Sequence, residues 1–263
     1  MATVADILSY IETEIAPRSM KMDWDNVGLN VGRRDKEVKK ILVALDPFAH
    51  VCQEAKEFGA DLLVTHHVLI FRPGFVTDSN AQGRNTLFLI ENGIAHINAH
   101  TNLDLAPGGV NDCLATRLGL ENPQVVCPAG VDESGREWGL LRRGTVKEQP
   151  LGEFLNHVKT ALGCDGLRFA DAGKPVHIVA CGGGSCCSEM LEAVEAGCDT
   201  FVTADAKYND FWDAYDLGLN LIDAGHFYTE NPVTTYLADR LAAAFPEITV
   251  KISESHHDCM KFY

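Results

Sequence analysis

The sequence predicts an α/β protein made of two linked α/β domains of similar topology. Apolar segments with strand character alternate with amphipathic helical segments, which is typical of parallel sheets covered by helices. This alternation occurs twice, and part of the first copy aligns without a gap with part of the second. The 263 residues are 46% hydrophobic and 22% charged, an ordinary globular composition that can fill one large core or two medium ones.

The first half of the chain contains one complete β-α-β-α-β pattern. Val4, Ile7, Leu8 and Ile11 recur at helical spacing near the N-terminus. The stretch WDNVGLNVG is rich in turn-forming residues and then becomes extended. The expected elements are a helix over 3–14, an extended segment within 24–32, a strand at 41–45, a helix at 49–58, a strand at 62–65, a helix at 84–92 and a strand at 94–100.

The second half repeats the same order of elements. A polar, glycine-rich stretch at 128–139 is expected to be a linker between the two patterns. The elements expected after it are a strand at 138–145, a helix at 151–162, a strand at 176–181, a helix at 186–197, a strand at 200–203, a helix at 207–217 and a strand at 219–223.

Direct sequence identity indicates an internal duplication. Residues 54–67 and 192–205 are identical at seven of fourteen positions, and the strands that follow them, 92–101 and 217–226, also match. We therefore expect one domain from residues 1–125 plus 216–263, and an inserted second domain from residues 126–215.

Charge and cysteine content narrow the classes of function. The net charge is −15, from 37 acidic and 22 basic residues, which disfavours binding to nucleic acid. The nine cysteines form no C-x-x-C pair, and no basic and apolar leader or 18-residue apolar stretch is present. We therefore expect a cytoplasmic protein with reduced thiols and no membrane segment.

Three clusters with metal-binding chemistry follow predicted strands. They are T-H-H at 65–67, H-T-N-L-D at 100–104 and G-H-F-Y-T-E at 225–230. Ligands collect at the carboxyl edge of strands in open α/β sheets, and imidazole with carboxylate suits Zn, Fe(II), Mn or Ni. The pattern predicts a metal site at this edge of the first domain, although a single histidine at a strand end is more often structural.

Four motifs give the chain a resemblance to a known family. WDNVGLNVG (24–32), LLVTHHVLIF (62–71), AHTNLDLAPGGVND (99–112) and DAGHFYTE (223–230) resemble the Nif-three-like family of dinuclear metal-centre, hexameric proteins. Many members are named as homologues of a type-two GTP cyclohydrolase. The resemblance implies a homohexamer of two-domain subunits and two divalent ions per subunit, with Zn, Fe or Mn left open. The implied metal ligands are His66, His67, Asp104, His226 and Glu230.

The expected function is that of a metal-dependent hydrolase acting on a nucleotide-like small molecule, of the GTP cyclohydrolase type by resemblance. His100 is the candidate for proton transfer, or else a residue of the turn at 101–102. Asp25 and Asn26 are either turn-formers or groups that orient a histidine ligand. The alternative is a protein that stores or delivers metal, or binds partners, without turnover.

Two further motifs carry open alternatives. The turn at Gly182–Gly184 either exposes backbone N–H groups to phosphate or is simply a tight turn of the second repeat. The tail residues His256 and His257 have ligand chemistry but no predicted context. The second repeat has Ala204 and Asp205 at the positions of the double histidine, so we expect that half to bind no metal by itself.

Overall fold

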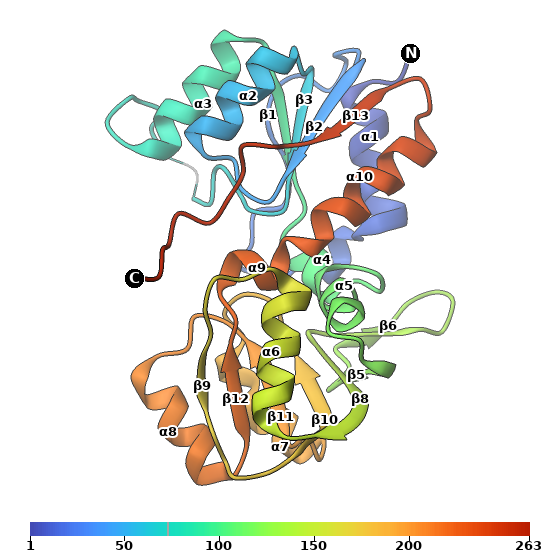
Figure 1. Ribbon diagram of the computed structural model, residues 1–263. Helices are drawn as coiled ribbons and strands as arrows, with labels where there is room; N and C mark the ends of the chain where they lie inside the picture. The colour runs from blue at the N-terminus through green and yellow to red at the C-terminus, as the bar shows by residue number, and fades with distance from the viewer. Residues whose placement is uncertain (73) are drawn as a thin grey trace. The chain divides into compact units, whose positions relative to one another are not determined.

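The computed structural model describes residues 1–72 and 74–263, which form two compact units (Figure 1). Unit 1 comprises Met1–Ala106 and Val233–His257, and unit 2 comprises Pro107–Pro232 and Asp258–Tyr263. Both units combine sheets with helices, so the predicted α/β class is confirmed.

The boundaries of the units differ from the expected division at residues 125 and 215. Strands β5 (Glu121–Val126) and β12 (Asn220–Asp223) pair within the sheet of unit 2, so the segments around them belong to that unit. As a consequence His226 and Glu230, which were expected in the first domain, lie in unit 2.

Unit 1 is built on a five-stranded sheet with the order β1-β4-β3-β2-β13. Four strands are parallel, and β1 pairs with β4 in the antiparallel sense. Every residue of β3 and β4 is buried, as expected of parallel strands covered on both faces. The strand bounds are β1 Gly28–Val31, β2 Lys40–Ala44, β3 Leu62–Thr65, β4 Ala95–Asn98 and β13 Thr249–Ile252.

Helices cover both faces of this sheet (Figure 1). On one face α2 and α3 contact each other and enclose a core that includes Leu42, Leu63 and Leu89. On the other face lie α1 and α10, joined by a hydrogen bond from Tyr10 Oη to the Arg240 carbonyl. The helices are α1 Val4–Tyr10, π-helical Ile11–Ile15, 3-10 helical Arg18–Met20, α2 Ala49–Phe58, α3 Ala81–Glu91, α4 Thr101–Leu105 and α10 Pro232–Ala244.

Unit 2 contains a six-stranded sheet with the order β5-β8-β10-β11-β12-β9. Only β10, β11 and β12 are parallel, and antiparallel strands extend the sheet on both sides. Two apolar clusters, one around Phe154 and one around Phe201, fill its core. The other strands are β6 Gly130–Val131, β7 Glu137–Trp138, β8 Leu141–Gln149, β9 Arg168–Ala170, β10 Val176–Cys181 and β11 Thr200–Thr203.

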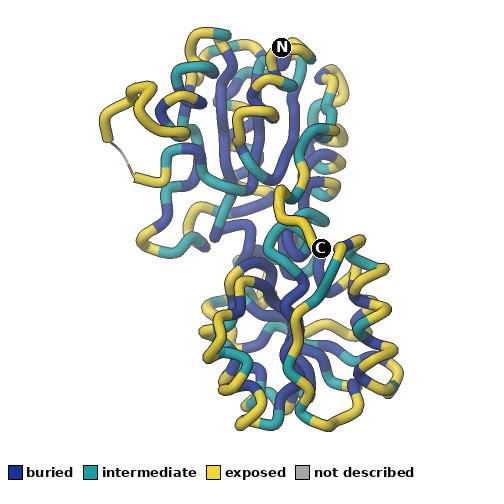
Figure 2. Tube along the Cα trace, turned by 60° about the vertical axis from the view of Figure 1, so that its left-hand side comes forward, coloured by how far each residue is buried: buried dark blue, intermediate teal, exposed yellow. Residues whose placement is uncertain are grey.

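In unit 2, buried apolar residues of α5 and α6 join the cluster around Phe154, and those of α7 and α8 join the cluster around Phe201. Figure 2 shows the central strands of each unit buried and the outer helical faces exposed. The helices are α5 Val110–Arg117, α6 Leu151–Leu162, 3-10 helical Cys187–Glu189, α7 Met190–Glu195, α8 Tyr208–Leu217 and α9 His226–Glu230. Among the described residues, no helix combines the length and the apolar character needed to cross a membrane.

The two units share one local topology. The order β2-α2-β3-α3-β4 in unit 1 corresponds to β10-α7-β11-α8-β12 in unit 2, with three parallel strands in each. Thr65 pairs with Asn98, and the residues aligned with them, Thr203 and Asp223, pair in the same register. This correspondence agrees with the predicted duplication, whose common origin remains a prediction.

Three predicted elements need correction. The segment 128–139 contains the β6–β7 hairpin rather than only a linker, because Asp132 accepts hydrogen bonds from the turn amides of Ser134 and Arg136. The helix expected at 186–197 begins as a 3-10 turn, so that α7 covers only Met190–Glu195. The strand expected at 94–100 ends at Asn98, which leaves His100 outside the sheet.

Glu54 on α2 fastens the segment that follows β13. Its carboxylate accepts hydrogen bonds from Ser253 Oγ at 2.5 Å and from the amides of Glu254 and Ser255, both at 3.0 Å. Burial opposes the charged form, yet these bonds lower the pKa of Glu54 from 4.5 to about 2. The carboxylate therefore contributes stability above pH 4.5, and this contribution is lost as the pH falls toward 2.

We expect Glu54→Gln to lower the free energy of unfolding at pH 7 by about 1–3 kcal/mol, because a charged acceptor of several hydrogen bonds is lost. The difference from the wild type should shrink as the pH falls from 4.5 toward 2. Urea denaturation at several pH values measures this, with exposed Glu57→Gln on the same helix as the control. Equal stability of the two variants at pH 7 would contradict the assigned role.

Candidate functional site

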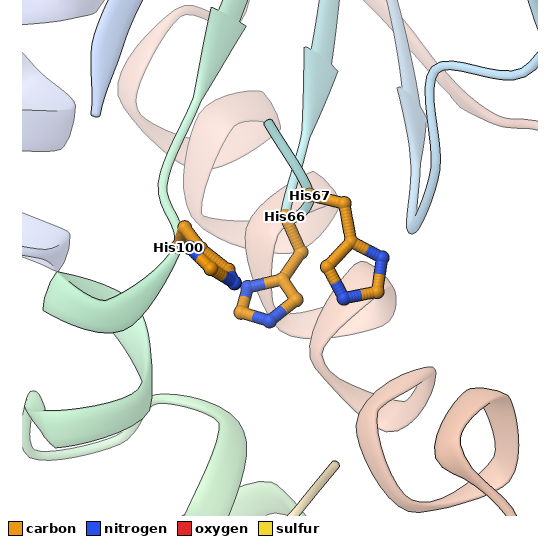
Figure 3. Close-up of side chains that lie close together, drawn as sticks. All are labelled: His66, His67 and His100. Carbon is orange, nitrogen blue, oxygen red and sulfur yellow. The ribbon is translucent and has the colours of Figure 1, made fainter. Parts of the chain in front are cut away.

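Three imidazoles cluster in unit 1, just beyond the ends of two neighbouring strands (Figure 3). His66 and His67 follow β3, which ends at Thr65, and His100 follows β4. The ring centroid of His66 lies 4.8 Å from that of His67 and 5.3 Å from that of His100. Because β3 ends before the double histidine, the two adjacent side chains converge instead of pointing to opposite faces.

The Nδ1 atom of each ring is held by an oxygen that can only accept. His66 Nδ1 lies 2.9 Å from the Ala99 carbonyl, and His67 Nδ1 lies 2.6 Å from Oδ1 of Asp46. His100 Nδ1 lies 3.0 Å from Oδ1 of Asp25. Because these oxygens only accept, Nδ1 is the donor in each case, and a neutral ring in this tautomer has its lone pair on Nε2. Metal-binding histidines in proteins are oriented in this manner.

The environments of these rings differ in solvent access. The side chain of His66 is fully buried, whereas those of His67 and His100 are about one-fifth exposed. Asp104 on α4 adds a carboxylate, with Oδ1 3.5 Å from His66 Nε2. The three histidines can offer nitrogen atoms within 4.8 Å of one another, a spacing that suits a metal ion.

Asp25 is the buried anchor of His100. Besides the imidazole it binds the amide of Thr101 at 3.0 Å and the hydroxyl of Thr101 at 2.5 Å. Burial opposes its charge, but the hydrogen bonds from His100 and Thr101 lower the pKa of Asp25 to about 2. Asp25 thus orients the His100 ring. The turn at 101–102 is held by the backbone amide of His100, which donates to Oδ1 of Asn102.

A second group of ligand type lies in unit 2. His226 and Glu230 stand one helical turn apart on α9, with Nε2 and Oε2 separated by 3.0 Å. His226 Nδ1 lies 2.7 Å from Oδ2 of Asp205. Burial lowers the pKa of His226, but the bonds to Asp205 and Glu230 outweigh it and raise the pKa to about 11. A metal ion that binds Nε2 of His226 must therefore displace a proton.

Comparisons with known proteins place the chain in a family. The model of the family described as Duf34/NIF3 (NGG1p interacting factor 3) matches residues 2–259. A Clostridium perfringens protein named GTP cyclohydrolase 1 type 2 homolog is 39% identical over 239 residues, which cover 90% of each chain. A Clostridium acetobutylicum protein of the same name is 32% identical over 266 residues, 98% of each chain.

The chain belongs to the Duf34/NIF3 family. The solved structures agree. A Bacillus cereus protein related to NIF3 matches with a TM-score of 0.94 and 26% identity, over 100% of this chain and 99% of that chain. The resemblance found in the four sequence motifs is therefore confirmed, and it extends through nearly the whole length of this Duf34/NIF3 protein.

The glycine turn of this Duf34/NIF3 chain is a packing element. The amide of Gly183 donates to Oδ1 of Asn111 at 2.7 Å, and the amide of Gly184 donates to Oγ1 of Thr229 at 3.0 Å. These N–H groups are already used within the protein, so the phosphate-binding interpretation of the turn is wrong. The turn lies directly against Glu230, and a Cβ on Gly184 would collide with its carboxylate.

The C-terminal histidines are held by their own segment. His256 Nδ1 and His257 Nδ1 each lie 2.6 Å from a backbone carbonyl, those of Ser253 and Ser255. Across residues 1–72 and 74–263, no group of three or more metal-ligand side chains includes either histidine. The structure therefore gives no support to a second metal site in the tail.

Sequence reasoning missed the two carboxylates that orient histidines, Asp46 and Asp205. Asp46 lies two residues after the end of β2, so the rule that selected the histidines at strand ends could also have found it. Asp205 was noted only as a replacement for His67 in the second repeat. It has a positive φ of 54°, which turns the chain where the strand ends and lets its carboxylate reach His226.

We expect Gly183→Ala to displace Glu230 and to weaken Zn(II) binding by about tenfold or more, as for other residues that support a ligand. The added Cβ would lie 2.8 Å from Cγ1 of Val110 and 3.2 Å from Cγ of Glu230. Gly182→Ala is the matched control, because its Cβ would press on Leu141 and Cys186 instead.

Both variants should lose stability, by about 1–3 kcal/mol, because both overfill a packed region. Competition titration of Zn(II) against a chelator separates them, since only Gly183→Ala should bind the ion more weakly. Equal Zn(II) affinity in the two variants would show that the turn does not position Glu230 for a metal.

Proposed function

We propose that the chain binds two divalent transition-metal ions and uses them in a metal-dependent hydrolysis of a nucleotide-like metabolite. The proposal requires the two units to bring their ligand groups to the same pair of ions, with Glu230 as a bridge. The proposed ligands are His66, His67 and Asp104 of unit 1, and His226 and Glu230 of unit 2.

The observation that carries the proposal is the way in which the imidazoles are held. In all four rings Nδ1 faces an oxygen that accepts a hydrogen bond, so all four imidazoles are oriented in the same way, with Nε2 as the atom available for coordination. In unit 1 the Nε2 atom of His66 lies 3.5 Å from Oδ1 of Asp104, which brings a nitrogen and a carboxylate oxygen together. Nitrogen and carboxylate donors of this kind suit Zn, Fe(II) or Mn, and the ligand set does not choose among them.

His100 is the proposed proton-transfer residue. Asp25 holds its Nδ1 proton, so Nε2 can accept a proton from a reacting group and later return it. Its ring lies beside those of His66 and His67 and keeps some contact with solvent. Two bound divalent ions would supply polarisation of the substrate and would acidify water near them.

The substrate class comes from the relatives and from charge. The Clostridium relatives are named as GTP cyclohydrolase homologues, which points to a nucleotide. A net charge of −15 disfavours nucleic acid as the partner, so a free small molecule is the better candidate. Assembly into a homohexamer, which the family resemblance implies, belongs to the same proposal.

Metal content tests the proposed ligands. We expect the reconstituted wild type to hold up to two ions per chain, and Glu230→Gln to lose more than half of them, because a bridging group serves both ions. Exposed Glu121→Gln in the same unit is the control and should retain the wild-type content. Elemental analysis after gel filtration gives the ratio, and unchanged metal content in Glu230→Gln would refute the bridge.

A metabolite screen tests the activity. Protein reconstituted separately with Fe(II), Mn(II) and Zn(II) is incubated with nucleotides, and hydrolysis products are followed by mass spectrometry. We expect turnover that His100→Ala reduces about 10²- to 10⁴-fold, the usual contribution of a general acid or base. Metal binding with no turnover under any of the three metals would favour storage or delivery of metal instead.

A further inference from the structure

Two exposed aromatic side chains lie beside the histidine cluster of unit 1. Trp24 is 58% exposed and Phe71 is 40% exposed, although aromatic side chains usually bury most of their surface. Their ring centroids are 5.7 Å apart, and the planes are tilted by 46°. The Trp24 ring also lies 6.1 Å from the ring of His100, edge to face. One aromatic surface therefore leads directly to the proposed proton-transfer residue.

The turn that carries Trp24 is fastened on both sides. The amide of Met22 donates to Oγ1 of Thr101, and the amide of Asp25 donates to the Met22 carbonyl, both at 3.0 Å. The Asp25 carboxylate is itself buried against Thr101 and His100. The same carboxylate that orients His100 thus fixes the turn next to Trp24.

The chain next to Phe71 is held as well. Asn26 Nδ2 donates to the Ile70 carbonyl at 2.6 Å, and the Ile70 amide donates to Oδ1 of Asn30 at 3.2 Å. Buried or half-buried polar anchors therefore hold two exposed rings in place. Two exposed rings in contact form an apolar patch, and such patches mark binding sites more often than single exposed apolar side chains do.

We infer that Trp24 and Phe71 form a stacking surface for the planar heteroaromatic ring of the substrate, such as a nucleobase. This inference rests on the proposed function, because the stacked ring would lie beside the histidines proposed to bind metal and transfer protons. Every nucleobase presents a π face, so aromatic side chains bind such rings with little dependence on the base.

The surface also indicates which end of the substrate faces the reacting groups. A ring stacked on Trp24 lies next to His100, so the reacting bond belongs to the ring or to the atom that links it to the sugar.

Binding experiments with nucleoside monophosphates test the surface independently of turnover. The chain has three tryptophans, and the double variant Trp138→Phe, Trp212→Phe leaves Trp24 as the only one. Adding guanosine, adenosine, cytidine or uridine monophosphate should quench its fluorescence, and ribose 5-phosphate, which lacks the ring, should not. Quenching by ribose 5-phosphate to the same extent, or by none of the nucleotides, would overturn the inference.

Calorimetry on variants of the full chain gives the second arm. Trp24→Ala should weaken nucleoside monophosphate binding about 10- to 100-fold, and Trp24→Phe should restore most of it. Trp212→Ala is the control, because Trp212 is 54% exposed but lies in unit 2. Equal affinity of Trp24→Ala and the wild type would refute the stacking surface.

The two proposals fail in different ways. Nucleotide binding that depends on Trp24 without any turnover would keep the stacking surface and refute the hydrolase. Turnover with a KM that Trp24→Ala leaves unchanged would keep the hydrolase and refute the stacking surface.

Discussion

The hydrogen bond at Nδ1 of each clustered histidine is the interaction on which the candidate site depends. A neutral imidazole can offer one lone pair, and an acceptor at Nδ1 decides that the lone pair is on Nε2. The Ala99 carbonyl does this for His66, and Asp46 does it for His67. These acceptors follow β4 and β2, the strands on either side of β3, so the sheet itself sets the orientation of both rings.

The same arrangement explains why the site lies at the ends of the strands. Every residue of β3 and β4 is buried, so polar side chains within these two strands have no access to a ligand. Just beyond Thr65 and Asn98 the backbone turns, and adjacent side chains can converge. Unit 2 has the same arrangement of polar residues beyond strand ends, because Asp205 follows β11 and contacts His226, which follows β12.

Sequence patterns predicted the parallel strands well, because continuous apolar runs such as ILVAL leave few alternatives to a buried strand. They also located the histidines at the strand ends. The boundaries of the units were not predictable, since β5 and β12 join the sheet of unit 2 through strand pairing, which no local pattern reveals. The roles of Asp25 and Gly183 depend on contacts with residues 75 and 47 positions away, to which no local pattern points.

The most direct test of the account is anomalous diffraction at the metal edge from crystals of the Zn(II)-loaded protein. We expect two anomalous peaks about 3.5–4 Å apart, with His66 and His67 coordinating through Nε2 at about 2.0–2.1 Å. Their Nδ1 atoms should keep the hydrogen bonds to Ala99 and Asp46. Coordination through Nδ1, or metal bound only at the His256–His257 tail, would contradict the claim that these hydrogen bonds prepare the metal site.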